Sequence, residues 1–81
     1  MNASKPIAAS ETLDRRKQIA ARMRMAREFA GISQKDLAEW MPIDQANVSR
    51  WEHGGTVTLT NLMRYADGVG VRVESLFKGI S

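Results

Sequence analysis

The stretch from Gln34 to His53 constrains the fold more than any other part of the chain, because it predicts two short helices that meet at a turn. Apolar residues recur at helical spacing on both sides of Pro42, namely Leu37, Ala38 and Met41 before it and Val48 and Trp51 after it. If these residues pack inward, the second helix presents one outward face with donors, acceptors and a positive charge, made by Gln45, Ala46, Ser49, Arg50 and His53.

This stretch resembles the Cro/repressor type of helix-turn-helix DNA-binding domain, an XRE-like family. The resemblance rests on Gln34, Leu37-Ala38, Ile43 and the run Val48 to Glu52 followed by a glycine, and it extends from about Ile19 to Phe77. It implies an all-α fold, a compact lambda-repressor-like bundle of about five helices. The second helix of the motif, the recognition helix at about 44–53, is then expected to lie in the DNA major groove.

Pro42 departs from the family pattern, which usually has a glycine in the left-handed conformation at this position. Proline holds φ at about −65° and cannot adopt that conformation. It also disfavours helix at the preceding residue, so we expect the first motif helix to end by Trp40 or Met41. The turn must therefore be built differently from that of the family.

The resemblance also implies which side chains contact DNA. The family positions that face the bases are occupied by Gln45, Ala46, Asn47, Ser49 and Arg50. Their chemistry fits this role, since a glutamine amide can pair with adenine, an arginine fork with guanine, and an alanine methyl with the thymine methyl. Phosphate contacts are expected from Ser33, Gln34, Arg22, Arg24 and Thr56. A solvated polar surface is the alternative for both sets, and phosphate is the alternative target for Asn47.

Arg27 and Glu52 match a family pair that forms a salt bridge between the first helix and the recognition helix. A bidentate contact between arginine and a carboxylate fixes orientation. We therefore interpret these two residues as structural.

Capping residues and apolar spacing predict the remaining helices. A first helix is expected from about Thr12 to Ala30, because Ile19, Met23, Ala26 and Ala30 repeat at helical spacing before Gly31. Ser33, Asp44 and Thr58 are placed to cap the next three helices. Gly70 is expected to end the last of these in a left-handed conformation, and Gly68 to weaken its final turn.

The two ends of the chain carry the weakest signals. Residues 1–11 predict a mobile tail, either inert or an arm that reaches a minor groove with Lys5, and residues 12–81 form the domain. A short helix at about 73–77 is expected to cover the core with Val73, Leu76 and Phe77. The alternating valines of VGVRVES leave a strand open as the alternative.

Bulk properties limit the possible functions. Eighty-one residues make one domain, and the basic residues concentrated between Arg15 and Lys35 suit a polyanion, although a solvated helix face is the alternative. The absence of cysteine, of a secretory signal and of any apolar run near about 20 residues leads us to expect a cytoplasmic protein. With one histidine and no phosphate loop or metal-ligand spacing, we expect no enzyme activity, no metal and no cofactor.

The leading interpretation is a sequence-specific DNA-binding repressor that acts as a homodimer on a palindromic operator in double-stranded DNA. The dimer contacts are expected from Val71, Phe77 and Ile80. Within this class the string TLTNLMRYADGVG also resembles antitoxins that repress their own operon, which would bring a toxin as protein partner. A protein-binding adaptor using Trp40, without DNA binding, and a membrane-surface role for the first helix remain as alternatives from other classes.

Overall fold

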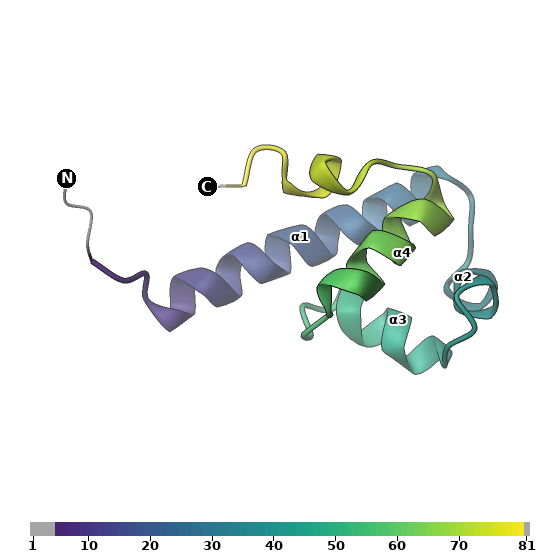
Figure 1. The fold of residues 1–81 in the computed structure, drawn as a ribbon, viewed down its shortest axis with the longest axis horizontal. Helices are drawn as coiled ribbons and strands as arrows, with labels where there is room; N and C mark the ends of the chain where they lie inside the picture. The colour runs from purple at the N-terminus through teal and green to yellow at the C-terminus, as the bar shows by residue number, and fades with distance from the viewer. Residues whose placement is uncertain (1–4, 81) are drawn as a thin grey trace.

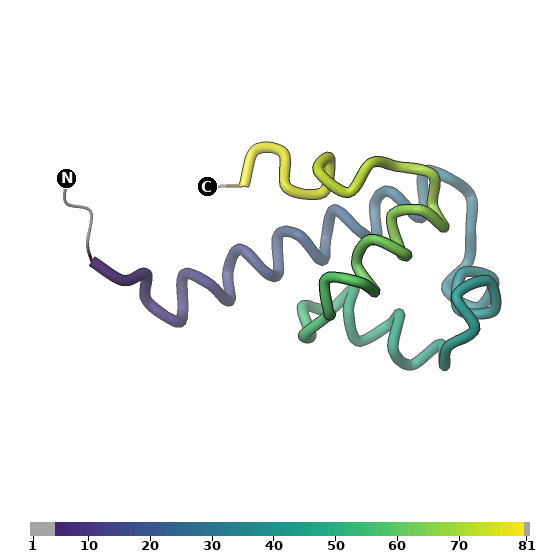
Figure 2. Tube along the Cα trace, viewed as in Figure 1, coloured from purple at the N-terminus to yellow at the C-terminus, as the bar shows by residue number. Residues whose placement is uncertain are grey.

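The fold is described by a computed structural model that covers residues 5–80. Within these residues the elements are α1 (Ala9–Phe29), α2 (Gln34–Trp40), α3 (Gln45–Glu52), α4 (Leu59–Val69) and the 3-10 helix η1 (Val73–Phe77). The long helix α1 packs against α3, α4 and η1, while α2 packs against α3 and α4 (Figure 1). The N-terminal part of α1 extends past the other helices, which the trace in Figure 2 shows clearly.

The prediction of five helices is corrected by this structure. The described residues contain four α-helices and no strand, and the last element is a 3-10 helix. The hydrogen bonds at its two ends span three residues, from Ser75 N to Arg72 O and from Lys78 N to Ser75 O. Five residues provide too few helical hydrogen bonds to offset the cost of nucleating an α-helix, so the tighter turn forms instead.

The first helix begins at Ala9, three residues before the predicted start at Thr12. The Glu11 side chain accepts a hydrogen bond from the Ala8 backbone N–H at 3.2 Å and so satisfies one of the free donors at the helix end. This first turn is exposed, and apolar periodicity therefore did not reveal it. Of the tail expected at residues 1–11, residues 1–4 lie outside the described residues.

The three side-chain caps predicted from the sequence are confirmed. The Ser33 hydroxyl accepts from the N–H of Asp36 at 3.0 Å, and the Asp44 carboxylate from the N–H of Ala46 at 2.8 Å. Thr58 accepts from the N–H of Asn61 at 3.1 Å. Each cap satisfies a backbone donor that the helix cannot satisfy itself, so the boundaries of α2, α3 and α4 follow from local chemistry.

The turn at Pro42 forms without a left-handed residue, as this departure from the family requires. Among the described residues only glycines have positive φ, and Met41 has φ −78° and ψ 1°. The backbone N–H of Ile43 donates to the carbonyl of Ala38 at 2.9 Å and closes the turn. Helix α2 accordingly ends at Trp40, as predicted.

One apolar core lies between the helices. Its buried members are Met23, Leu37, Ala38, Met41, Val48, Trp51, Leu62, Tyr65, Ala66, Val69 and Leu76. Two residues expected in this core are outside it, since Ala30 follows the end of α1 and is exposed, and Phe77 is 40% exposed. Leu76 covers the core as predicted and Val73 packs against it, so only Phe77 of the three residues expected from this segment is exposed.

Gly68 has a packing role that the sequence did not indicate. A Cβ atom at this position would lie 2.5 Å from Leu37 Cδ1 and 3.0 Å from the Trp40 ring. The absence of a side chain thus lets α4 approach α2 closely. Gly70 ends α4 with φ +78°, as predicted.

Candidate nucleic-acid interface

The outward face of α3 presents the side chains that the sequence assigned to base contacts. Gln45, Ala46 and Arg50 are exposed, whereas Asn47 and Ser49 are partly exposed. On the opposite side Val48 and Trp51 are buried and attach the helix to the core. The structure therefore places all five predicted residues on solvent-accessible positions of one short helix.

The side chains of Arg50 in α3 and of His53, which follows the helix, are held by residues of α3. An Arg50 Nη2 atom donates to the side-chain oxygen of Asn47, and the His53 ring Nδ1 lies 2.7 Å from the Ser49 carbonyl. Gly55 packs against Arg50, because a Cβ atom there would lie 2.8 Å from the Arg50 carbonyl oxygen. Arg50 is thus positioned from both sides, while its remaining donors can reach a ligand.

Glu52 anchors the buried side of α3. Its carboxylate receives a bidentate contact from Arg27, with Nε to Oε2 at 2.7 Å and Nη2 to Oε1 at 2.9 Å. The exposed fractions of the two side chains are 10% for Arg27 and 0% for Glu52. Arg27 also donates from Nη1 to the carbonyl of Ile32 at 2.9 Å, so one guanidinium joins α1, the turn before α2, and α3.

Tyr65 completes this buried network, and sequence reasoning missed it. Its hydroxyl is within hydrogen-bond distance of Glu52 Oε2 and of the Met23 carbonyl, the latter at 2.8 Å. A hydroxyl has one proton, and we assign it to the carboxylate because a charged acceptor binds more strongly. A lone tyrosine in a helical stripe gives no signal for such a contact, because the partner lies on another helix.

The network shifts the ionisation of its members. Burial alone would raise the pKa of Glu52, but hydrogen bonds from Arg27, Tyr65 and Gln34 outweigh it and lower that pKa. The hydrogen bond to Glu52 raises the pKa of Arg27 above its usual value. Burial, followed by the hydrogen bond to Glu52, raises the pKa of Tyr65 well above its usual value. Glu52 and Arg27 are therefore charged at neutral pH, and Tyr65 keeps its proton.

The predicted phosphate residues are not all on one surface. The Gln34 amide donates from Nε2 to Glu52 Oε1 at 3.1 Å, so this side chain supports the ion pair instead of pointing freely outward. Ser33 and Thr56 are exposed, on either side of α3 in the sequence. Arg22 lies elsewhere, because its guanidinium approaches Gly79 in the C-terminal segment, where a Cβ atom would be 3.3 Å from Nη2.

Arg16 and Lys17 lie beside α3, although neither was among the predicted phosphate residues. Arg16 Nε donates to the Gly54 carbonyl at 2.7 Å, and Lys17 Cγ would lie 3.0 Å from a Cβ atom on Gly54. Arg24 follows Lys17 by seven residues and therefore shares its side of α1. No signal in the sequence reveals the contact with Gly54, because 38 residues separate it from Arg16.

Within residues 5–80, no helix is long and apolar enough to cross a membrane. Nor do three carboxylate or imidazole side chains of the described part of the chain gather where they could hold a metal ion.

A family model described as helix-turn-helix domain matches residues 18–76, which is more than half of the chain. The chain belongs to the helix-turn-helix domain family. In this helix-turn-helix domain α2 and α3 form the motif, and α3 occupies the position of the recognition helix. Domains of this type bind DNA with that helix in the major groove. Comparison with curated proteins gives no match.

Proposed function

We propose that this helix-turn-helix protein is a sequence-specific transcriptional regulator, acting as a homodimeric repressor on a palindromic operator. The observation that carries the proposal is the position of Gln45 and Arg50 on the exposed face of a helix whose other face is fixed by Glu52. Tight and specific binding is favoured when the contacting side chains are already ordered in the free protein. A side chain that becomes ordered only on binding lowers the affinity.

The chemistry of the α3 face determines what it can read. Arg50 can form a bidentate contact with guanine, the Gln45 amide can pair with adenine, and the Ala46 methyl can contact a thymine methyl. Asn47 and Ser49 contribute from the sides of the face. Asn47 also orients Arg50 through the hydrogen bond between their side chains, so its loss would affect Arg50 as well.

The phosphate contacts in this proposal come from Ser33, Gln34, Arg24 and Thr56. Gln34 has a double role, because its amide nitrogen is bound to Glu52 and any phosphate contact near the start of α2 is thereby coupled to the ion pair. We leave Arg22 out, since it faces the C-terminal segment.

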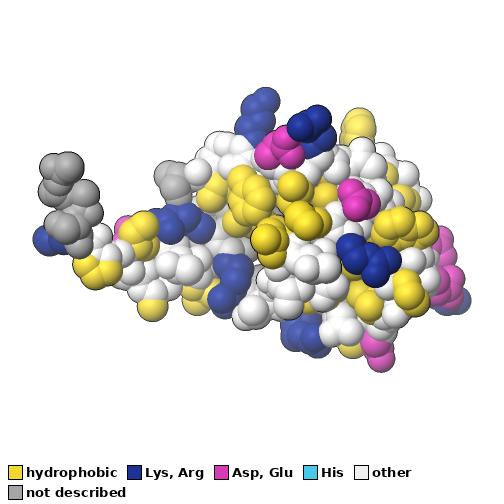
Figure 3. All heavy atoms as spheres, viewed as in Figure 1, with side chains coloured by type: hydrophobic (Ala, Val, Ile, Leu, Met, Phe, Trp, Pro, Cys, Tyr) yellow, Lys and Arg dark blue, Asp and Glu magenta, His cyan; other side chains and the backbone are white. Residues whose placement is uncertain are grey.

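A dimer supplies the second half-site. One recognition helix reads only a few base pairs, so useful specificity needs two half-sites one turn of DNA apart. Figure 3 shows hydrophobic side chains gathered between η1 and α4, and exposed apolar residues of these elements are Leu59, Met63 and Phe77. Val71 and Ile80 lie before and after η1, are partly exposed and extend this surface. We propose this face as the dimer contact.

Two observations support other functions. Phe29, at the end of α1, is 97% exposed and Met25 one turn before it is 59% exposed, which favours a protein partner such as the toxin of an antitoxin pair. Trp40 is 54% exposed with Arg64 stacked on its ring, Cζ being 5.8 Å from the ring centroid. This second surface favours an adaptor.

Selection of bound duplexes from a random DNA pool tests the proposal. Enrichment of a palindrome supports the repressor. A protein that enriches no sequence would contradict it and favour the adaptor. The matched variant is Arg50→Ala, which should lose the enrichment at one base pair of each half-site because the bidentate contact is removed.

A further inference from the structure

The N-terminal part of α1 lies outside the family match. The match begins at residue 18, whereas α1 begins at Ala9 and extends past the other helices (Figure 2). We refer to residues 9–17 as the α1 overhang. Its last turn carries three consecutive cations, Arg15, Arg16 and Lys17, which the base-reading role of α3 does not use.

The end of the overhang is attached to the loop that follows the recognition helix. Arg16 donates from Nε to the Gly54 carbonyl at 2.7 Å, and Lys17 packs over the same glycine. Gly54 has φ +94° and is buried beneath them. An uncovered carbonyl oxygen at the end of α3 would repel a phosphate. The Arg16 guanidinium binds this oxygen and brings a positive charge to the same place.

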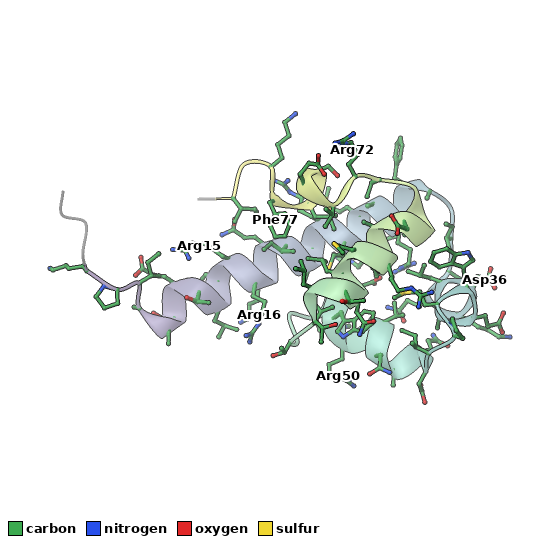
Figure 4. The ribbon with its side chains drawn as sticks, in the orientation of Figure 1. Arg15, Arg16, Asp36, Arg50, Arg72 and Phe77 are labelled. Carbon is green, nitrogen blue, oxygen red and sulfur yellow. The ribbon has the colours of Figure 1, made fainter. Side chains whose placement is uncertain are left out.

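Charges of opposite sign are separated around the overhang. Glu11 and Asp14 line a shallow hollow together with Arg15 and Gln18. Figure 4 shows Arg16 on the same side of α1 as Arg50, and Arg15 on the other side. Lys17 packs on Gly54 through Cγ, and it follows Asp14 by three residues on the surface of α1. The two side chains of the overhang that reach Gly54, at the end of the recognition helix, are therefore both cations.

We propose that Arg16 and Lys17 form a phosphate-binding site that contacts the DNA backbone beside the base pairs read by α3. This inference rests on the proposed function. Arg16 is fixed by the Gly54 carbonyl while its guanidinium stays exposed, and Lys17 adds a second exposed cation. Because phosphates carry no sequence information, the site lengthens the contact with DNA without changing which operator is preferred.

The salt dependence of binding tests the site, with Arg15 as the matched control. Arg15→Ala and Lys17→Ala each remove one positive charge from the same turn of α1, so their effect on net charge is equal. The slope of log K against log salt concentration is negative, and each lost phosphate contact makes it shallower by about 0.9. We expect that reduction for Lys17→Ala, equally on all sequences, an unchanged slope for Arg15→Ala, and a restored slope for Lys17→Arg.

A hydroxyl-radical footprint gives a second readout. Lys17→Ala should lose protection at the outermost backbone positions of each half-site while the central protection remains. Arg16→Ala can weaken DNA binding in two ways, because it removes both a positive charge and the hydrogen bond to Gly54. The unfolding midpoint of this variant must therefore be measured together with its affinity for DNA. Equal slopes for Lys17→Ala and Arg15→Ala on a duplex that the wild-type protein binds would overturn this site alone. If the wild-type protein binds no duplex, the proposed function fails with it.

Discussion

Arg27 on α1 and Glu52 on α3 meet in a bidentate ion pair across 25 residues of sequence, with Nε and Oε2 2.7 Å apart. The pair holds the C-terminal end of the recognition helix, since Glu52 is the last residue of α3. Gln34 and Tyr65 donate to the same carboxylate from α2 and α4. The three other α-helices therefore fix the orientation of α3 through one side chain.

Removing one member of this pair should destabilise the fold strongly. Arg27→Ala leaves a buried carboxylate unpaired, which typically costs about 3–5 kcal/mol of unfolding free energy. Arg72→Ala is the control, because its pair with Glu74 is exposed and should be worth at most about 1 kcal/mol. Denaturant melts of the single and double variants of Arg27 and Glu52 measure the coupling. A coupling near zero would show that the two side chains do not interact in solution.

Acid should weaken the fold through Glu52. Its pKa is lower in the folded state than its ordinary value of 4.5, so its contribution to stability is complete above that pH and is lost as pH falls through the folded pKa. Tyr65→Phe removes one hydrogen bond that lowers this pKa, so the acid-induced loss through Glu52 should be smaller and should be complete at a higher pH. Unfolding midpoints in urea across this pH range provide the measurement. An acid transition that does not move would contradict the assignment of the hydroxyl proton to Glu52.

Gly55→Ala should affect stability and DNA binding together. The added Cβ atom would lie 2.8 Å from the Arg50 carbonyl oxygen and 2.7 Å from Arg50 Cγ. We expect a loss of about 1–3 kcal/mol in unfolding free energy and weaker DNA binding, because Arg50 must move. The loss should persist in an Arg50→Ala background, since the carbonyl remains. If Gly55→Ala costs no stability in the Arg50→Ala background, the added Cβ atom clashes with the Arg50 side chain alone and not with the carbonyl.

The spacing of the half-sites tests the dimer. Two recognition helices related by two-fold symmetry should bind half-sites about 34–36 Å apart on one face of the duplex. Inserting about five base pairs moves the second half-site to the opposite face, and tight binding should be lost. Titration of both duplexes under the same salt conditions gives the comparison. Unchanged affinity on the longer duplex would count against a two-fold dimer.

Much of the helix-turn-helix unit was predictable because its signals are local. The caps Ser33, Asp44 and Thr58 act on backbone groups within three residues of themselves, so their effect is the same in any tertiary context. The end of α2 before Pro42 has the same local origin. The pair of Arg27 and Glu52, in contrast, was reached only through resemblance to a family.

What the sequence could not show depends on contacts between distant segments. Tyr65 reads as one more member of the α4 stripe, and its hydroxyl reaches Glu52 only because α3 and α4 both pack on α1. The contact of Arg16 with Gly54 has the same origin. The start of α1 at Ala9 was missed because an exposed helical turn needs no apolar periodicity.

The affinity of Arg50→Ala and Gln45→Ala for a set of single-base operator variants tests the base-reading role of α3 most directly. Both side chains are exposed on α3 and, in our account, touch base edges. Each replacement should cost about 1–3 kcal/mol on the cognate operator and relax the preference at one base pair per half-site, with little change in non-specific binding. A uniform loss across the set, or no loss at all, would contradict the assignment of α3 as the recognition helix.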